Sequence, residues 1–252
     1  MTEWWKAFFD AEYIRIWGSW FAGERTAAEV DGLWRLLALH EGSRVLDAPC
    51  GYGRLSRPLA ERGAVVLGVD QSEALLEHAN SERGTLPPER LRYLHHDLRQ
   101  PLPESGFDVA INIFSSLGYG TEDDDLAILR NLRSAVRPGG LVLVETMHRD
   151  LVVVNFLRGA KPWRRMNDGT LVVEEPVFNP IAGSVNATWY WAGPGGSGQK
   201  SATMRAYCAT ELVALMEKAG LRFRSAHKGC SPEPYVADGP DMGGRLAILA
   251  ER

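Results

Sequence analysis

Two acidic residues and two glycines occur at a spacing that suits the binding of a nucleotide-like ligand. Segment 45–53 is apolar up to Asp47 and then contains Gly51 and Gly53, which predicts a buried strand, a glycine turn and the start of a helix. Such a turn lets a ligand approach bare backbone at a helix N-terminus. The next apolar run ends at Asp70, and a carboxylate in that place can accept hydrogen bonds from ribose hydroxyls. Together the four residues indicate a ligand that contains a nucleoside.

The glycine turn differs from the dinucleotide fingerprint G-x-G-x-x-G. Gly51 and Gly53 are followed by Arg-Leu-Ser at 54–56, so the third glycine is missing. An acid directly before the turn, such as Asp47, is also not part of that fingerprint. An NAD-linked oxidoreductase therefore stays open only as a less favoured alternative.

The composition is that of an ordinary globular protein. The 252 residues are enough for one large domain, and 45% of them are hydrophobic and 24% charged. The net charge of −4 argues against a nucleic-acid partner. No apolar run reaches the length of about 18 residues that a membrane-spanning helix needs. Cys50, Cys208 and Cys230 show no paired or metal-type spacing. We therefore expect a cytoplasmic protein without a metal site.

The elements that must position these residues alternate between strand and helix after residue 43. Apolar runs predict strands at 44–47, 64–70, 91–96, 107–113, 140–146, 221–227 and 245–250. Amphipathic spacing predicts helices at 54–62, 72–83, 123–136 and 210–219. Continuous apolar strands between amphipathic helices are typical of a parallel sheet that is covered on both faces. The predicted fold class is α/β, with a doubly wound sheet.

Two segments depart from this rhythm, and together they contain all eight tryptophans. Residues 4–21 carry aromatic side chains at helical spacing, and a second helix is expected from about 24 to 40. Segment 149–209 predicts a small antiparallel β insertion with a helix at 150–157, strands at 170–178, 185–192 and 203–208, and a glycine-rich loop at 193–198. Residues 1–40 and 149–209 are the candidate cap over the ligand site.

In the order of its motifs the sequence resembles the class I, Rossmann-like S-adenosylmethionine-dependent methyltransferases, in their small-molecule branch. The motifs that carry the resemblance lie at 47–53, 70–72, 96–98, 107–110, 112–119, 137–140, 205–207, 210–212 and 219–221. The resemblance implies a seven-stranded, mostly parallel sheet whose last strand is reversed. It also implies a single domain over 1–252, with a helical cap at 1–40, a cofactor-binding core at 41–148, an antiparallel lid at 149–209 and completion of the sheet at 210–252.

The same resemblance implies which residues meet the cofactor S-adenosyl-L-methionine and its product S-adenosyl-L-homocysteine. The glycine turn is expected to hold the methionine part, Asp70 the ribose and Asp97 the exocyclic amine of adenine. The expected cofactor residues are Asp47, Ala48, Gly51, Tyr52, Gly53, Asp70, Gln71, Asp97, Leu98 and Phe114. Carboxylates and aromatic faces both stabilise a cationic sulfonium.

Candidate acceptor-side residues come from the ends of strands and from the cap. His148 closely follows the strand at 140–146 and is the candidate general base for an acceptor hydroxyl or amine, with a structural histidine as the alternative. The expected substrate-binding residues are Tyr13, Trp17, Ser115, Tyr119, Trp189 and Tyr207. Core packing is the alternative for the aromatic side chains among them.

The expected activity is methyl transfer to a nitrogen, oxygen or carbon atom of a small molecule, by in-line displacement in a capped site that excludes water. The aromatic cap suggests a partly apolar acceptor. A non-catalytic protein that binds S-adenosylmethionine is an alternative, and methylation of nucleic acid is disfavoured by the acidic balance. We expect a monomer or homodimer without nucleic-acid or membrane partners.

Overall fold

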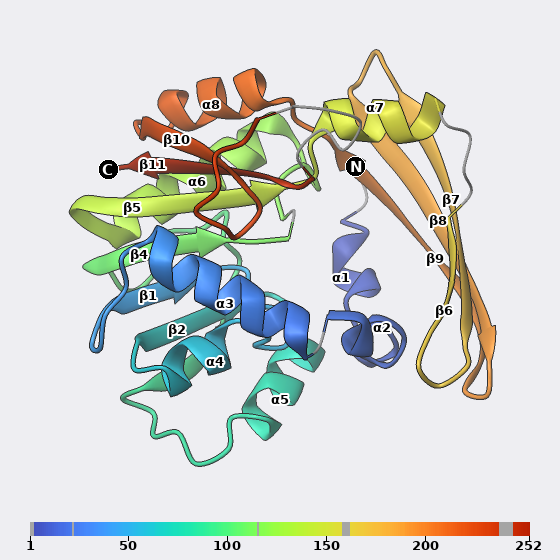
Figure 1. Cartoon of the computed structure of the whole chain (residues 1–252), viewed down its shortest axis with the longest axis horizontal. Coiled ribbons are helices and arrows are strands. Elements are labelled where there is room, and N and C mark those ends of the chain that lie inside the picture. The colour runs from blue at the N-terminus through green and yellow to red at the C-terminus, as the bar shows by residue number, and fades with distance from the viewer. Residues whose placement is uncertain (1–2, 22, 115, 158–161, 237–243) are drawn as a thin grey trace.

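A seven-stranded sheet forms the centre of the computed structural model, which describes residues 3–21, 23–114, 116–157, 162–236 and 244–252 (Figure 1). Its strands follow the order β3-β2-β1-β4-β5-β11-β10. Their bounds are β1 Arg44–Asp47, β2 Val65–Asp70, β3 Leu91–His95, β4 Phe107–Asn112, β5 Val136–Thr146, β10 Arg222–Lys228 and β11 Leu246–Glu251. β11 pairs antiparallel with β5 and β10, whereas β1 to β5 pair in parallel. The predicted mostly parallel sheet with a reversed last strand is confirmed.

Helices cover both faces of this sheet because its strands carry apolar side chains on each side. Leu46 of β1 belongs to an apolar cluster with α6 and α8, whereas its neighbour Val45 belongs to a cluster with α3 and α4. Successive residues of a strand point to opposite faces, so both layers are filled by one continuous apolar run. The helices are α3 Glu24–Leu36, α4 Ser56–Glu61, α5 Glu73–Ser81, α6 Glu122–Ala135 and α8 Ala209–Lys218.

The aromatic N-terminal segment differs from the single helix that we expected at 4–21. It folds as α1 Trp5–Phe8, α2 Ala11–Trp17 and the 3-10 helix η1 Gly18–Phe21. The helical run is interrupted at Asp10, because the Asp10 side chain accepts the N–H of Tyr13 and so caps a new helix. The next helix, α3, ends at Leu36 instead of near 40, since Ala38 adopts a positive φ of 49°.

A second, four-stranded antiparallel sheet follows α7 (Arg149–Leu157), in the order β6-β7-β8-β9. Its strands are β6 Trp163–Arg165, β7 Leu171–Asn179, β8 Ser184–Gly193 and β9 Gly196–Arg205. The glycine-rich stretch expected as a loop at 193–198 is a tight hairpin in which Gly193 pairs with Gly196. Gly198 is therefore a strand residue, and a Cβ there would lie 2.5 Å from the ring of Trp191. The prediction of a strand at 203–208 was wrong in its bounds, and β6 was not predicted.

The second sheet stands beside the parallel sheet, with α1 and α2 between the two (Figure 1). Phe8 and Trp17 share an apolar cluster with Trp191 of β8. The two ends of segment 149–209 meet the core side by side, because the flanking residues His148 and Tyr207 form a β-bridge. None of the helices in the described residues has the length and apolar character that a membrane span requires.

Candidate active site

A cavity of about 450 Å³ lies where the carboxyl ends of the parallel strands meet the N-terminal helices and the second sheet. Small-molecule sites usually have volumes of about 300–1,000 Å³, so the cavity is large enough for such a ligand. Asp47 and Asp70 reach it from β1 and β2, Tyr13 and Trp17 reach it from α2, and Trp189 reaches it from β8. Open α/β sheets bind their ligands at this edge, where the strand order reverses.

Asp70 is fixed at the end of β2 by backbone donors. Its Oδ2 accepts the N–H of Gly51 at 2.8 Å, and its Oδ1 accepts the N–H of Ser72 at 2.9 Å. Burial raises the pKa of Asp70, although these hydrogen bonds favour the charged form. Each carboxylate oxygen has a second lone pair, so the residue can still accept hydrogen bonds from ligand hydroxyls.

The two glycines of the turn have different surroundings. Gly51, at a φ of +55°, lines the cavity together with Tyr52 and Gln71. Gly53 is not part of the lining, and a Cβ there would lie 2.3 Å from Oη of Tyr93 on β3. In the described structure, position 53 therefore needs a glycine because Tyr93 packs against the turn and leaves no room for a side chain.

Asp47 is almost fully buried at the end of β1 and still borders the cavity. The hydroxyl of Ser56 donates to its Oδ2 at 2.5 Å. Burial raises the pKa of Asp47 to about 7, because the charged form is poorly solvated there. Its neighbour Ala48 is fully buried and lies outside the lining, and its carbonyl accepts the side-chain amide of Asn112 at 2.7 Å.

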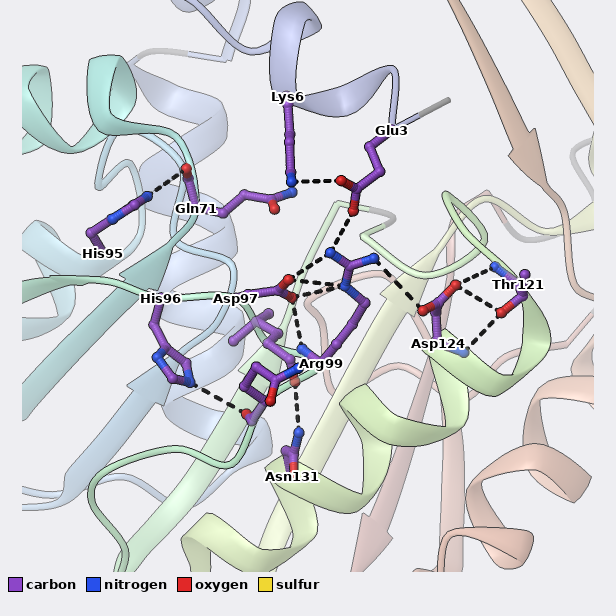
Figure 2. Close-up of polar contacts among 12 residues, drawn as sticks. Glu3, Lys6, Gln71, His95, His96, Asp97, Arg99, Thr121, Asp124 and Asn131 are labelled. Atoms are coloured by element: carbon purple, nitrogen blue, oxygen red, sulfur yellow. Dashed lines mark hydrogen bonds and ion pairs between the residues drawn. The ribbon is translucent and has the colours of Figure 1, made fainter. Parts of the chain in front are cut away.

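Asp97 lies in an ion-pair network that reaches the N-terminal helix (Figure 2). Nε of Arg99 donates to both oxygens of Asp97 at 3.0 Å, and this contact lowers the pKa of the Asp97 carboxyl. Nη2 of Arg99 also donates to Glu3 at 2.5 Å. Arg99 lies 3.7 Å from Asp124, at the start of α6. Arg99 thus connects three segments around one end of the cavity, which Leu98 also lines.

Aromatic rings form the walls around the acids. Tyr13 stacks on Trp17 with ring centroids 5.3 Å apart, and Tyr119 stacks on Phe9 at 5.9 Å. Trp189 meets Trp17 edge-on at 6.4 Å. Burial raises the pKa of Tyr13 and of Tyr119, so both remain neutral phenols near neutral pH.

Phe114 follows β4 in a strained conformation, with a φ of +75°. Its N–H donates to Oε2 of Glu145 at 2.8 Å, and Arg245 donates to the same oxygen at 2.9 Å. The guanidinium of Arg245 lies 4.5 Å from the centroid of the Phe114 ring. The ion pair of Arg245 with the buried Glu145 holds Phe114 against the cavity, where Phe21 packs edge-on against it at 4.6 Å.

Two expected acceptor-side residues, His148 and Tyr207, are not among the described residues that line the cavity. His148 is buried outside the lining, with its Nδ1 2.6 Å from the hydroxyl of Tyr235, and burial lowers its pKa. Tyr207 is also buried outside the lining and donates to Asp125 at 2.5 Å. Ser115 lies outside the described residues. The structure therefore does not bring His148 and Tyr207 to the cavity.

Several charged residues that line the cavity were not predicted from the sequence as site residues. Arg99 comes two residues after the expected adenine acid, and Arg245 directly precedes the last strand. Glu174 lies two residues after the buried Val172 on β7, so the two side chains share a face, and this spacing could have placed Glu174 on the inner face of the sheet. Long-range pairs such as Arg99 with Glu3 leave no local signal.

Chemically, the cavity suits a ligand with hydroxyl groups and a positive charge. The acids lie at the strand ends, and aromatic faces cover them from the opposite side. Both features stabilise a cation, and the cover keeps water away from a bound ligand.

Comparisons with known proteins agree with this arrangement. A family model described as "Methyltransferase domain" matches residues 45–140. The chain is 34% identical over 180 residues to the ubiquinone biosynthesis O-methyltransferase of Ruegeria pomeroyi, covering 60% of this chain and 67% of that protein. It is 31% identical over 162 residues to the glycine N-methyltransferase of Mus musculus, covering 58% of this chain. The chain spans 55% of the length of that relative.

The solved structure of the CcbJ methyltransferase from Streptomyces caelestis has the same fold. Its TM-score is 0.77 at 20% sequence identity, and the match covers 97% of both chains. The similarity therefore extends over the N-terminal helices and the second sheet as well as the parallel core.

Proposed function

Because this chain belongs to the class I S-adenosylmethionine-dependent methyltransferases, we propose that it transfers the methyl group of S-adenosyl-L-methionine to a small-molecule acceptor. The observation that carries the proposal is the placement of Asp47, Gly51 and Asp70 at adjacent strand ends in one covered cavity. When bound, S-adenosyl-L-methionine supplies an electrophilic methyl group on a sulfonium.

The residues of the cavity fit this cofactor. We propose that Asp70 accepts hydrogen bonds from the ribose hydroxyls and that Asp97 and Leu98 meet the adenine. The turn at Gly51 would hold the methionine part, close to Asp47. The chemistry of these side chains supports the assignment, because the carboxylates and the ring of Phe114 both stabilise a cationic ligand.

On the acceptor side we propose that Tyr13, Trp17, Tyr119 and Trp189 enclose the substrate. Segment 1–40 would act as the cap and segment 149–209 as the lid on the core at 41–148, with 210–252 completing the sheet. These walls exclude water and hold the acceptor near the methyl group, which is how a displacement of this kind gains most of its rate. The acceptor atom is a nitrogen, oxygen or carbon.

We also propose a cytoplasmic location, because Cys50, Cys208 and Cys230 are unpaired and buried at separate sites. The protein would act as a monomer or homodimer on a small molecule. The net charge of −4 supports a substrate other than nucleic acid.

Calorimetric titration of the purified protein with S-adenosylmethionine, S-adenosylhomocysteine and NAD tests the function. We expect the two adenosyl ligands to bind and NAD to bind far more weakly or not at all. Preference for NAD, or no heat with either adenosyl ligand, would contradict the proposal. Binding of the adenosyl ligands then justifies a screen of acceptors by release of S-adenosylhomocysteine.

A change at Glu3 tests whether the network at Arg99 retains the bound cofactor. We expect Glu3→Gln to speed the dissociation of S-adenosylhomocysteine only modestly, about two- to fivefold at low salt, because a solvent-exposed ion pair contributes little. The difference should shrink at high salt, since salt screens the pair. Stopped-flow fluorescence measures the rate. Glu12→Gln is the control, because Glu12 pairs with Arg15 on α2 and, among the described residues, neither of the two lines the cavity. An unchanged rate at low salt would count against this role of α1.

A further inference from the structure

The second sheet contributes one acidic side chain to an otherwise apolar cavity wall. Among the described residues, those of β7 to β9 that line the cavity are Glu174, Val185, Ala187, Trp189, Ala202 and Met204. These residues share the inner face of the sheet, because Glu174 pairs with Trp189 and the alternate residues of each strand point the same way. Glu174 therefore stands in a wall that is built for an apolar body.

The carboxylate of Glu174 is held in place by its neighbours. The side chain of Trp189 donates a hydrogen bond to it, and the ring of Trp189 meets that of Phe8 edge-on at 5.5 Å. Lys200 pairs with Trp189 on the next strand, but its ammonium donates to Asp10 at 2.7 Å. Lys200 is thus turned toward α2 and does not line the cavity.

Arg164 is the basic residue of β6 whose charge acts on Glu174. It pairs with Val172 and does not line the cavity, whereas Glu174 does. The positive charge of Arg164 opposes the burial that raises the pKa of Glu174, and so favours the carboxylate form. The polar group that the described part of this sheet presents to a ligand is accordingly the carboxyl of Glu174 and not the guanidinium of Arg164.

A carboxylate in an apolar wall selects for a particular ligand chemistry. It gains most from a partner that is both charged and a hydrogen-bond donor, because such bonds are stronger than neutral ones. Aromatic faces attract cations as well, and Trp189 supplies such a ring beside Glu174, whereas the ring of Phe8 already has the ammonium of Lys200 at 5.6 Å from its centroid. An acidic acceptor would be repelled, and a neutral one would leave the carboxylate poorly solvated.

We propose that Glu174 and Trp189 bind the ammonium group of a basic, partly apolar acceptor. This inference rests on the proposed methyl transfer and names the substrate class for it. An ammonium has no lone pair to attack the methyl group, so it serves to position the acceptor, and another atom of the same molecule takes the methyl group. Phe8 and Trp17 would pack against the apolar body of the same molecule.

Binding of matched probes to the protein saturated with S-adenosylhomocysteine tests the inference. The probes are 2-phenylethylammonium, 2-phenylethanol and phenylacetate, which share a body and differ in charge. We expect the ammonium probe to bind about tenfold more tightly than the alcohol at pH 7.5, with phenylacetate weakest. Glu174→Gln should remove the preference for the ammonium. Glu175→Gln, on the opposite face of β7, should leave it unchanged.

The outcomes separate this inference from the proposed function. Failure of S-adenosylhomocysteine to bind the unchanged protein would overturn the function itself. If S-adenosylhomocysteine binds, then equal binding of the ammonium and the alcohol, no binding of the ammonium, or an ammonium preference that survives Glu174→Gln would overturn the inference alone. The affinity for S-adenosylhomocysteine and the thermal midpoint of Glu174→Gln establish that the variant is folded.

Discussion

Replacing Asp70 by alanine is expected to weaken the binding of S-adenosylhomocysteine about 100-fold or more. Hydrogen bonds from ribose hydroxyls to a carboxylate are each worth about 1.5–3 kcal/mol, and two of them are lost together. The substitution also leaves the N–H groups of Gly51 and Ser72 without the acceptor that orders the turn. Calorimetric titration measures the change in Kd.

Two further variants make the result for Asp70 specific. Asp70→Asn keeps the shape of the side chain and an acceptor oxygen, so its Kd should lie between those of the unchanged protein and Asp70→Ala. Asp31→Asn removes an acid from the exposed side of α3, where Asp31 pairs with Arg62, and should leave the Kd unchanged. An unaltered affinity in a folded Asp70→Ala protein would refute the assignment of the ribose site.

Replacing Asp47 by asparagine is expected to stabilise the ligand-free protein, increasingly as the pH rises. Burial raises the pKa of Asp47 from 3.8 to about 7, so between these values the folded state holds a proton that the unfolded state has lost. The stabilisation from this proton is complete below pH 3.8 and disappears as the pH rises through about 7. Asparagine stays neutral and has no such loss.

The difference in free energy of unfolding between Asp47→Asn and the unchanged protein should grow by about 2.5 kcal/mol from pH 5 to pH 7.5. Urea denaturation of the ligand-free proteins at both pH values measures it. Asp108→Asn is the control: the hydrogen bond from Arg137 helps to lower the pKa of Asp108, so the carboxyl is ionised in both states across this range and the effect of the substitution should be the same at pH 5 and pH 7.5. A difference for Asp47→Asn that does not change with pH would show that the carboxyl is solvated in the folded protein.

The parallel core was predictable because its strands are buried on both faces. Val45 and Leu46 pack into opposite helical layers, so the strand appears in the sequence as an uninterrupted apolar run. Asp70 could be placed at the strand end for the same reason. The roles expected from the resemblance for Asp97 and Phe114 remain predictions, although both residues lie on the cavity.

The segments at 1–40 and 149–209 were harder to predict because their structure depends on local exceptions and distant contacts. Asp10 interrupts an aromatic stripe that is helical on both sides of it. Gly198 has the composition of a loop residue, yet it lies in a strand to make room for Trp191. The contact between Arg99 and Glu3 joins residues 96 apart, and the periodicity of either segment gives no sign of it.

The two ends of the insertion at 149–209 lie side by side on the core, where His148 bridges Tyr207 and the N–H of Arg149 donates to the carbonyl of Tyr207 at 3.0 Å. Its two ends therefore fix only one short distance on the core. The chain between them can change in length and sequence without moving the parallel strands. Such an arrangement would let evolution vary the proposed acceptor end of the cavity while the parallel sheet that binds the cofactor stays the same.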